Sequence, residues 1–238
     1  MLRGGEIIKF VKDILFPIFC LSCEKVEETY LCEKCFEKLD FSGVFECSVC
    51  HKKSHFGEVC NKCKIKTSLD FEIAIFEYQE KYLIAKILHE FKYNFVEDLK
   101  NILEIFIDNF LQKNLDYFLD IDFIVPIPLH KKRFAERGFN QSEIIAKILA
   151  KKINKPVLNF LKRNRYTLQQ AKLDREGRLK NLEDSFEIIK NIDFDLENKN
   201  ILLVDDVFTT GTTMGEAAKI LKQNKIKIVK GFTIGRGK

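Results

Sequence analysis

All eight cysteines of this 238-residue chain lie between Cys20 and Cys63, and none of the residues from Lys64 to Lys238 is a cysteine. This confinement predicts a dedicated cysteine-rich module and a separate body. The cysteines form four C-x2-C pairs: Cys20 and Cys23, Cys32 and Cys35, Cys47 and Cys50, and Cys60 and Cys63. A C-x2-C turn presents two thiolates from one tight loop, which is half of a tetrahedral zinc site. The four pairs therefore predict two structural zinc ions.

The gaps between the pairs favour one way of sharing the thiolates. Eight residues separate the first pair from the second, nine separate the third from the fourth, and eleven lie between these halves. The similar gaps favour sequential pairing, with the first four cysteines on one zinc and the last four on the other. An interleaved arrangement is the alternative, because spacing alone does not determine connectivity. With eight thiolates present, we do not expect His51 or His55 to be a ligand.

The composition and the N-terminal sequence exclude several classes of protein. Hydrophobic residues make up 46% of the chain and charged residues 32%, as in a folded soluble protein. The apolar run Ile14–Leu21 contains Pro17 and is far shorter than the ~20 residues of a membrane span. Glu6 and Asp13 interrupt the region where a signal peptide would lie. We therefore expect a cytoplasmic protein without membrane insertion, whose cysteines bind metal rather than form disulfides.

Strand and helix patterns alternate along the rest of the chain. An amphipathic helix is predicted at 6–16, and a linker at 64–70 follows the cysteine-rich segment. We expect strands at 71–78, 121–127, 201–207 and 226–234, and helices at 82–91, 96–111, 141–153 and 212–223. This alternation predicts an α/β fold with a parallel sheet and crossover helices.

The positive charge of the chain is concentrated in one region. The net charge is +5, yet residues 121–190 carry 16 basic and 8 acidic residues, whereas 71–120 carry 5 and 10. Such a concentration favours an anionic ligand.

The most specific segment of the chain is 201–213, with the sequence ILLVDDVFTTGTT. Its apolar strand carries Asp205 and Asp206 to a C-terminal end, where open α/β sheets bind ligands. The next turn places threonines around Gly211 and leads into a helix, so its backbone N–H groups can hold an anion. Carboxylates just before such a turn can accept hydrogen bonds from sugar hydroxyls. The segment therefore predicts a ribose 5-phosphate site.

This segment resembles the phosphoribosyl pyrophosphate (PRPP) motif of the type I phosphoribosyltransferases, and the whole chain is similar to the ComF (ComFC) family. The residues that carry the resemblance are Val125–Leu129, Arg133, Arg137–Gln141, Thr167, Gln170, Leu173, Arg178, Asn181, Phe186, and the early Phe91, Lys92 and Tyr93. The resemblance implies a type I phosphoribosyltransferase fold at 69–238, behind an N-terminal helix and double zinc ribbon at 1–68.

The resemblance also implies roles for individual residues. Asp205 and Asp206 would hold the ribose hydroxyls, and Mg²⁺ would bind together with PRPP. The 5-phosphate would be held by Thr209, Thr210, Gly211, Thr212 and Thr213. The pyrophosphate loop (126–141) and the flexible loop (163–181) would contribute Arg133, Arg137 and Arg178. Lys92 would either reach the pyrophosphate or cap a helix. No catalytic acid or base is assigned.

Three functions are compatible with this resemblance. The first is an enzyme that transfers phosphoribose to an unidentified nitrogen acceptor. The second is a non-catalytic regulator that binds PRPP or a nucleotide. The third, compatible with either, is a role in natural transformation, with single-stranded DNA or competence proteins as partners. Glutamine-dependent amidotransfer is not expected, because residue 2 is Leu and no glutaminase domain precedes the fold. The chain ends soon after its last strand, so we expect the zinc module or the helices at 82–111 to replace a C-terminal acceptor hood.

Overall fold

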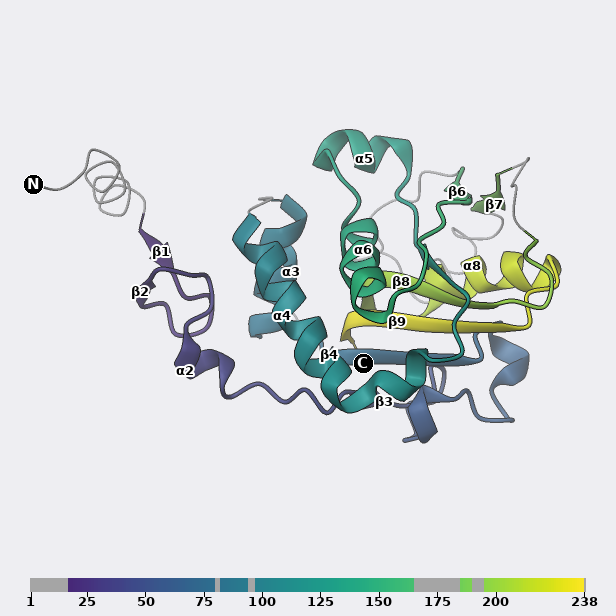
Figure 1. The fold of residues 1–238 in the computed structure, drawn as a ribbon, viewed down its shortest axis with the longest axis horizontal. Helices are drawn as coiled ribbons and strands as arrows, with labels where there is room; N and C mark the ends of the chain where they lie inside the picture. Colours follow the sequence, from purple (N-terminus) through teal and green to yellow (C-terminus); the bar gives the residue numbers. More distant parts are fainter. Residues whose placement is uncertain (1–16, 80–81, 94–96, 165–184, 190–194, 238) are drawn as a thin grey trace, which may run out of the picture.

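A five-stranded sheet with the order β3-β4-β9-β8-β5 forms the centre of the computed structural model (Figure 1). Its strands are β3 (Val44–Phe45), β4 (Phe71–Glu77), β5 (Phe123–Pro126), β8 (Asn200–Phe208) and β9 (Ile228–Arg236). Strands β4, β9, β8 and β5 are parallel to one another, and β3 pairs antiparallel with β4. The structure describes residues 17–79, 82–93, 97–164, 185–189 and 195–237, and the helix predicted at 6–16 lies outside them.

Helices and short hairpins surround this sheet. The helices are α2 (Glu33–Phe36), α3 (Leu83–Tyr93), α4 (Glu97–Asn114), α5 (Lys131–Arg137), α6 (Gln141–Ile153) and α8 (Thr212–Gln223). Three 3₁₀ turns are η1 (His55–Gly57), η2 (Lys64–Lys66) and η3 (Leu115–Phe118). Two hairpins pair β1 (Ile18–Phe19) with β2 (Val26–Glu27), and β6 (Leu161–Arg163) with β7 (Phe186–Ile188).

The predicted α/β class with a mostly parallel sheet is confirmed. Helices α6 and α8 have the predicted bounds, and the Asn140 side chain caps α6 by accepting from Ser142 N at 3.2 Å. The last strand extends beyond its predicted end to Arg236, because it continues to pair with Phe208 of β8. Helix α5 was not predicted within 126–141. It is short and ends at Gly138, whose φ of 77° is favourable for glycine.

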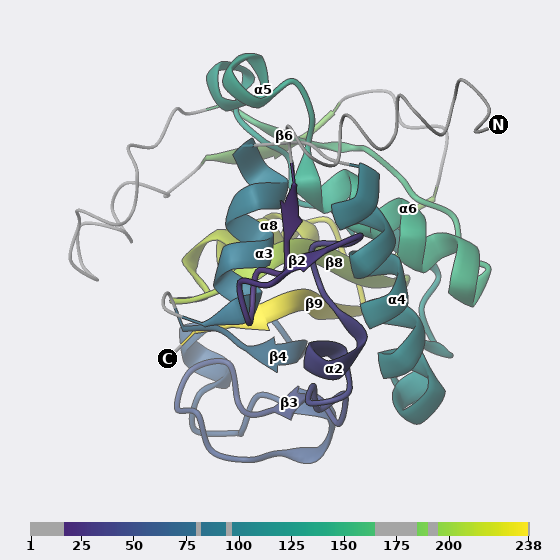
Figure 2. The same cartoon turned by 90° about the vertical axis from the view of Figure 1, so that its left-hand side faces the viewer.

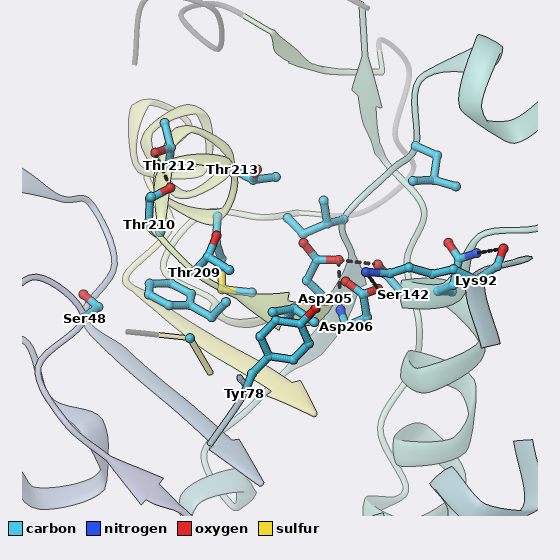
Figure 3. A pocket seen from close by; sticks show the side chains of 18 of the residues that line it. Ser48, Tyr78, Lys92, Ser142, Asp205, Asp206, Thr209, Thr210, Thr212 and Thr213 are labelled. Atoms are coloured by element: carbon cyan, nitrogen blue, oxygen red, sulfur yellow. Dashed lines mark hydrogen bonds and ion pairs between the residues drawn. The ribbon is translucent and has the colours of Figure 1, made fainter. Parts of the chain in front are cut away.

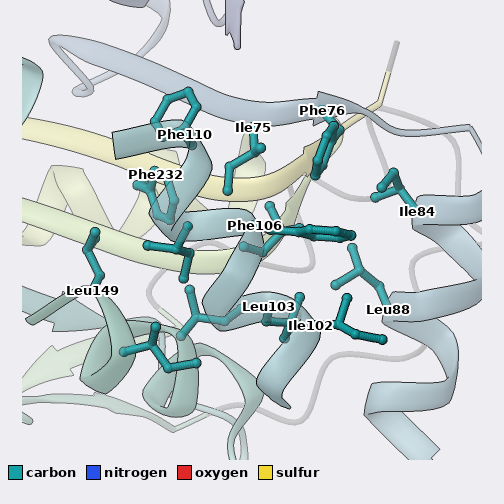
Figure 4. Packing of buried hydrophobic residues seen from close by; sticks show 14 of the residues in the cluster. Ile75, Phe76, Ile84, Leu88, Ile102, Leu103, Phe106, Phe110, Leu149 and Phe232 are labelled. Atoms are coloured by element: carbon teal, nitrogen blue, oxygen red, sulfur yellow. The ribbon is translucent and has the colours of Figure 1, made fainter. Parts of the chain in front are cut away.

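Two apolar layers cover the faces of the sheet. Helices α3, α4 and α6 cover one face, where side chains such as Phe106 and Phe110 of α4 pack on Ile75 and Phe232 (Figure 4). On the other face, α8 packs Met214 and its neighbouring alanines against the apolar residues of β8 and β9. The apolar run of β8 is therefore buried on both faces, as expected for a central parallel strand.

The two halves of the cysteine-rich segment take different places. The first half, with β1, β2 and α2, lies beside α3 and α4 (Figure 2), where Lys86 of α3 pairs with Glu24 at 3.2 Å. The segment that joins the halves places the Phe41 ring against Phe76 and Phe106, with centroids 5.3 and 5.9 Å away. The second half includes β3 and so forms part of the central sheet. The boundary at residue 68 stays a prediction.

Across the described residues, no helix is both long and apolar enough to cross a membrane.

We predict that Phe106→Ala lowers the free energy of unfolding by about 3–5 kcal/mol, because it leaves a cavity between α4, β4 and the Phe41 segment. Phe106 is fully buried and also packs on Phe76, with ring centroids 4.9 Å apart. The measurement is urea denaturation with zinc in excess. The control is the adjacent Ile105→Ala, whose side chain is 46% exposed and which should cost less than about 1 kcal/mol. Equal losses in the two variants would contradict this account of the core.

Candidate functional site

Two clusters of four thiols are present among the described residues. One contains Cys20, Cys23, Cys32 and Cys35, and the other contains Cys47, Cys50, Cys60 and Cys63. These are the groups expected from sequential pairing of the C-x2-C turns. No histidine belongs to either cluster as the described residues define them, and His51 instead lies 3.7 Å from Glu46.

The sulfur spacing tests whether the clusters suit zinc. Sγ of Cys23 lies 3.8 Å from that of Cys32, and Sγ of Cys50 lies 3.8 Å from that of Cys60. Four sulfurs about 2.3 Å from a central zinc stand about 3.8 Å apart, whereas disulfide sulfurs are about 2.05 Å apart. The clusters therefore have the size and the thiolate donors of structural zinc sites.

A pocket with a volume of about 850 Å³ lies at the C-terminal ends of the parallel strands. It brings together residues from β8, the threonine turn after it, the α5 region, α6, β6 and the second cysteine cluster (Figure 3). Parallel α/β sheets bind ligands at this end, because the loops that leave the strands converge there.

The threonine turn joins β8 to α8 at the pocket. Its lining residues are Thr209, Thr210, Gly211, Thr212 and Thr213. Thr210 and Thr212 share a hydrogen bond of 2.8 Å between their Oγ1 atoms. Gly211 has a φ of 73°, and a Cβ there would lie 2.5 Å from the Phe208 ring. Glycine is thus required by both backbone and packing, and the turn presents hydroxyls and backbone N–H groups to an anion.

The two carboxylates at the end of β8 each have a partner from another element. Ser142 of α6 donates a 2.7 Å hydrogen bond from Oγ to Oδ1 of Asp205. Lys92 of α3 forms an ion pair of 2.7 Å from Nζ to Oδ2 of Asp206. The structure therefore places Lys92 at the carboxylates, inside the pocket.

Burial and mutual charge shift the protonation of this group. Burial first, and then the charge of Asp206, raise the pKa of Asp205 to about 7 against the hydrogen bond from Ser142. Burial alone lowers the pKa of Lys92, but the carboxylate charges outweigh it and the net pKa is raised. Lys92 therefore keeps its positive charge beside the two carboxyl groups, and Asp205 stays protonated to a higher pH than a free aspartate.

Three arginines line the same pocket. Arg133 and Arg137 come from α5, and Arg137 donates to Gln141 Oε1 at 3.2 Å. Arg163 of β6 is buried, and its guanidinium lies 5.5 Å from the Phe186 ring centroid. Burial first, and then the charge of Arg133, lower the pKa of Arg163 to about 10. This side of the pocket is strongly cationic. Arg178 and most of the predicted flexible loop lie outside the described residues.

Several pocket residues were not identified as site residues from the sequence. Ser142 lies in a predicted helix, and no motif around it indicates a binding role. Arg163 is predicted only as the first residue of the flexible loop. Ser48, Val49 and His51 line the pocket from the second cysteine cluster. The sequence signal for Ser48 and Val49 is their position between Cys47 and Cys50, which marks a turn but does not show what the turn faces.

Arg236 connects the pocket to the second cysteine cluster. Its guanidinium forms an ion pair with Glu72 and donates to the backbone oxygens of Glu46 at 3.0 Å and Cys47 at 2.9 Å. The same group lies 5.2 Å from the centroid of the Phe208 ring, which packs beneath Gly211. The ion pair is fully buried and therefore links the sheet, the zinc cluster and the threonine turn.

Comparisons with known proteins agree with this geometry. A family described as phosphoribosyl transferase domain matches residues 93–235, and one described as double zinc ribbon domain matches residues 11–64. The chain is 28% identical over 211 residues to "Competence protein ComFC" of Bacillus subtilis, which covers 87% of this chain and 84% of that protein.

Two further relatives have related names. "Competence protein F" of Haemophilus influenzae is 24% identical over 240 residues, covering 93% of this chain and 98% of that protein. "DNA utilization protein YhgH" of Escherichia coli is 31% identical over 116 residues, about half of each chain at 48% and 49%.

We predict that Asp205→Asn stabilises the ligand-free protein increasingly as the pH rises from about 4 to about 7. In this window an unfolded Asp ionises, whereas Asp205 in the folded chain stays protonated up to its pKa of about 7. Wild-type stability is therefore lost as the pH rises through this window, and the neutral amide avoids that loss. Urea denaturation at pH 5.5 and pH 8 with excess zinc measures the difference. The exposed Asp116→Asn is the control, and an equal effect of Asp205→Asn at both pH values would contradict the shift.

We also predict that Arg236→Met costs about 3–5 kcal/mol of stability, because it leaves Glu72 buried without its cation. The double variant Glu72→Met with Arg236→Met should recover part of this loss. Arg236→Met should also speed the release of one of the two zinc ions to a chromogenic chelator, because Cys47 O loses its donor. Lys230→Met on the same strand removes another buried cation, paired with Asp120 at 2.6 Å, and should leave zinc release unchanged. Identical rates of zinc release in the two variants would show that Arg236 does not stabilise the second cysteine cluster.

Proposed function

Since this chain belongs to the phosphoribosyl transferase family, we propose that it binds PRPP with Mg²⁺ in the pocket at the end of β8. The observation that supports this most strongly is the order of chemical groups across one pocket. A threonine turn suits the 5-phosphate, two carboxylates suit the ribose hydroxyls, and the arginines suit the pyrophosphate.

The carboxyl groups of Asp205 and Asp206 are suited to the sugar because each has one protein partner and can still accept hydrogen bonds from a ligand. Asp205 accepts from Ser142 and retains free lone pairs, and Asp206 is held by Lys92. Ribose hydroxyls can donate to these oxygens while Lys92 turns toward the entering phosphates. Mg²⁺ prefers oxygen ligands, and Asp205 and Asp206 offer them beside the place of the sugar and pyrophosphate. When bound, the ion neutralises charge on the leaving pyrophosphate.

As an enzyme, the protein would transfer phosphoribose to a nitrogen acceptor. The C1–O bond to pyrophosphate breaks, a C1–N bond forms, and the acceptor nitrogen loses its proton to solvent. Charge builds on the leaving pyrophosphate, so Arg133, Arg137, Arg163 and Lys92 would act by electrostatic stabilisation. The alternative is a regulator that binds PRPP or a nucleotide in the same groups without turnover.

The names of the relatives support a role in competence. Two of them are named competence proteins, and a third is named a DNA utilization protein. We therefore propose that the chain acts in natural transformation, with competence proteins or single-stranded DNA as partners. The basic excess of residues 121–190 favours an anionic partner, and we assign the arginines that line the pocket to pyrophosphate rather than to DNA. Binding to DNA that weakens steeply with salt would support the nucleic-acid partner.

We predict that Asp205→Asn with Asp206→Asn weakens Mg²⁺–PRPP binding by at least about 100-fold, because the ribose hydroxyls and Mg²⁺ lose two carboxyl groups. Isothermal titration calorimetry measures the affinity, with Asp116→Asn as the exposed control. Unchanged affinity in the double variant would show that the carboxylates do not hold the sugar. No heat with wild-type protein would overturn the ligand assignment.

A coupled assay separates the enzyme from the regulator. Pyrophosphate release from PRPP in the presence of free nitrogen bases would establish turnover. PRPP binding without release for any base of the panel would favour the regulator.

A further inference from the structure

The turn of the second cysteine cluster forms one wall of the pocket. This turn, which we call the second knuckle, spans Cys47 to His51, and three of its residues line the pocket: Ser48, Val49 and His51. The turn of the first cluster at Leu21 and Ser22 does not line the pocket. Of the two clusters described, the second therefore contributes residues to the pocket that we propose binds PRPP.

The position of the second knuckle is set by several independent contacts. Cys47 N donates to Lys52 O at 2.8 Å, and His51 N donates to Cys47 O at 3.1 Å. Arg236 donates from below to the backbone oxygens of Glu46 and Cys47. Ser48 and Val49 thus stand on a turn closed by two cysteines of the cluster and held by the sheet, which is a rigid support for a ligand contact.

Ser48 carries a hydroxyl that the protein does not satisfy. The residue is 6% exposed, and its Oγ has no hydrogen-bond partner among the described residues. Three other hydroxyls of the pocket have partners, since Ser142 donates to Asp205 and Thr210 bonds with Thr212. A buried hydroxyl without a partner costs about 1–3 kcal/mol, so one that lines a pocket points to a ligand group.

The chemistry around Ser48 differs from that of the rest of the pocket. Figure 3 shows Ser48 and Lys92 on opposite sides of the threonine turn and the carboxylates. The knuckle contributes Ser48, Val49 and His51, and the lining also includes Tyr78, Phe208 and Gly237, none of which carries a fixed charge. The charged residues instead suit phosphate, sugar and pyrophosphate. This end is therefore suited to an uncharged, flat group with polar edges.

We infer that the second knuckle is the acceptor wall of the pocket and that Ser48 Oγ hydrogen-bonds a nitrogen heterocycle held there. The inference rests on the proposed PRPP function and adds to it the element that recognises the acceptor. A planar base offers edge donors and acceptors to a serine hydroxyl, which can act as either. Its faces are matched by the apolar and aromatic residues of the same lining, Val49, Tyr78 and Phe208.

The test compares ligands with and without a base in the same pocket. Ribose 5-phosphate occupies the phosphate and sugar groups alone, whereas the 5′-monophosphates of adenosine, guanosine, inosine, cytidine and uridine add a base. Calorimetry with wild-type protein should show at least one nucleotide binding about tenfold tighter than ribose 5-phosphate. Ser48→Ala should weaken that nucleotide by about fivefold and leave ribose 5-phosphate unchanged, because one hydrogen bond to the base is lost.

Ser54→Ala provides a matched control within the same ribbon. The Ser54 Oγ is also buried without a partner among the described residues, yet Ser54 does not line the pocket. Its substitution should change neither affinity. Neither variant should lower the thermal unfolding temperature, because each removes an unsatisfied hydroxyl.

The outcomes separate the inference from the function on which it rests. If ribose 5-phosphate and PRPP fail to bind wild-type protein, the proposed function is wrong and the inference with it. If ribose 5-phosphate binds but no nucleotide binds more tightly, the acceptor wall is wrong while the sugar-phosphate site stands. Equal nucleotide affinity in wild type and Ser48→Ala, or an equal loss in Ser54→Ala, would also overturn the role of Ser48.

Discussion

The buried ion pair between Glu72 and Arg236 joins the parts of this protein. Glu72 belongs to β4 and Arg236 to β9, and their side chains are 0% and 1% exposed. Removing both charges from water is costly, so such a pair persists only when its remaining donors are satisfied. Arg236 meets part of this need by donating to the backbone oxygens of Glu46 and Cys47, while its Nε has no hydrogen-bond partner among the described residues. These hydrogen bonds attach the cluster to the sheet, and three residues of its Cys47–His51 turn line the pocket.

The same arrangement explains why the two cysteine clusters differ in their relation to the site. The first cluster packs beside α3 and α4, and the Phe41 segment anchors it through Phe76 and Phe106. The second follows directly after β3, which pairs with β4 of the central sheet. Both clusters are suited to structural zinc, but the second also supplies a wall of the pocket. The same turn therefore carries two cysteines of the cluster and three residues that line the pocket.

Electrostatics organises the pocket before any ligand enters. The carboxylates at the end of β8 lie close together, and burial with mutual charge raises the pKa of Asp205 to about 7. Lys92 compensates Asp206, while the arginines from α5 and β6 remain on the cationic side. An anionic ligand with sugar hydroxyls would satisfy both sides at once. Its phosphate oxygens would pair with the cations, and its hydroxyls would donate hydrogen bonds to the carboxylates.

Much of this could be predicted from residues that are close together in the chain. The C-x2-C spacing predicted the grouping of the cysteines, and the run 201–213 predicted a buried strand, an acidic end and a turn that requires Gly211. These features depend on local backbone geometry, which neighbouring residues determine by themselves. Only the tertiary structure decided that Lys92 meets Asp206, that Ser142 meets Asp205 and that Ser48 faces the pocket. Those contacts join separate helices, strands and turns. The order of strands in the sheet brings these elements together, and Arg236 holds the turn that carries Ser48.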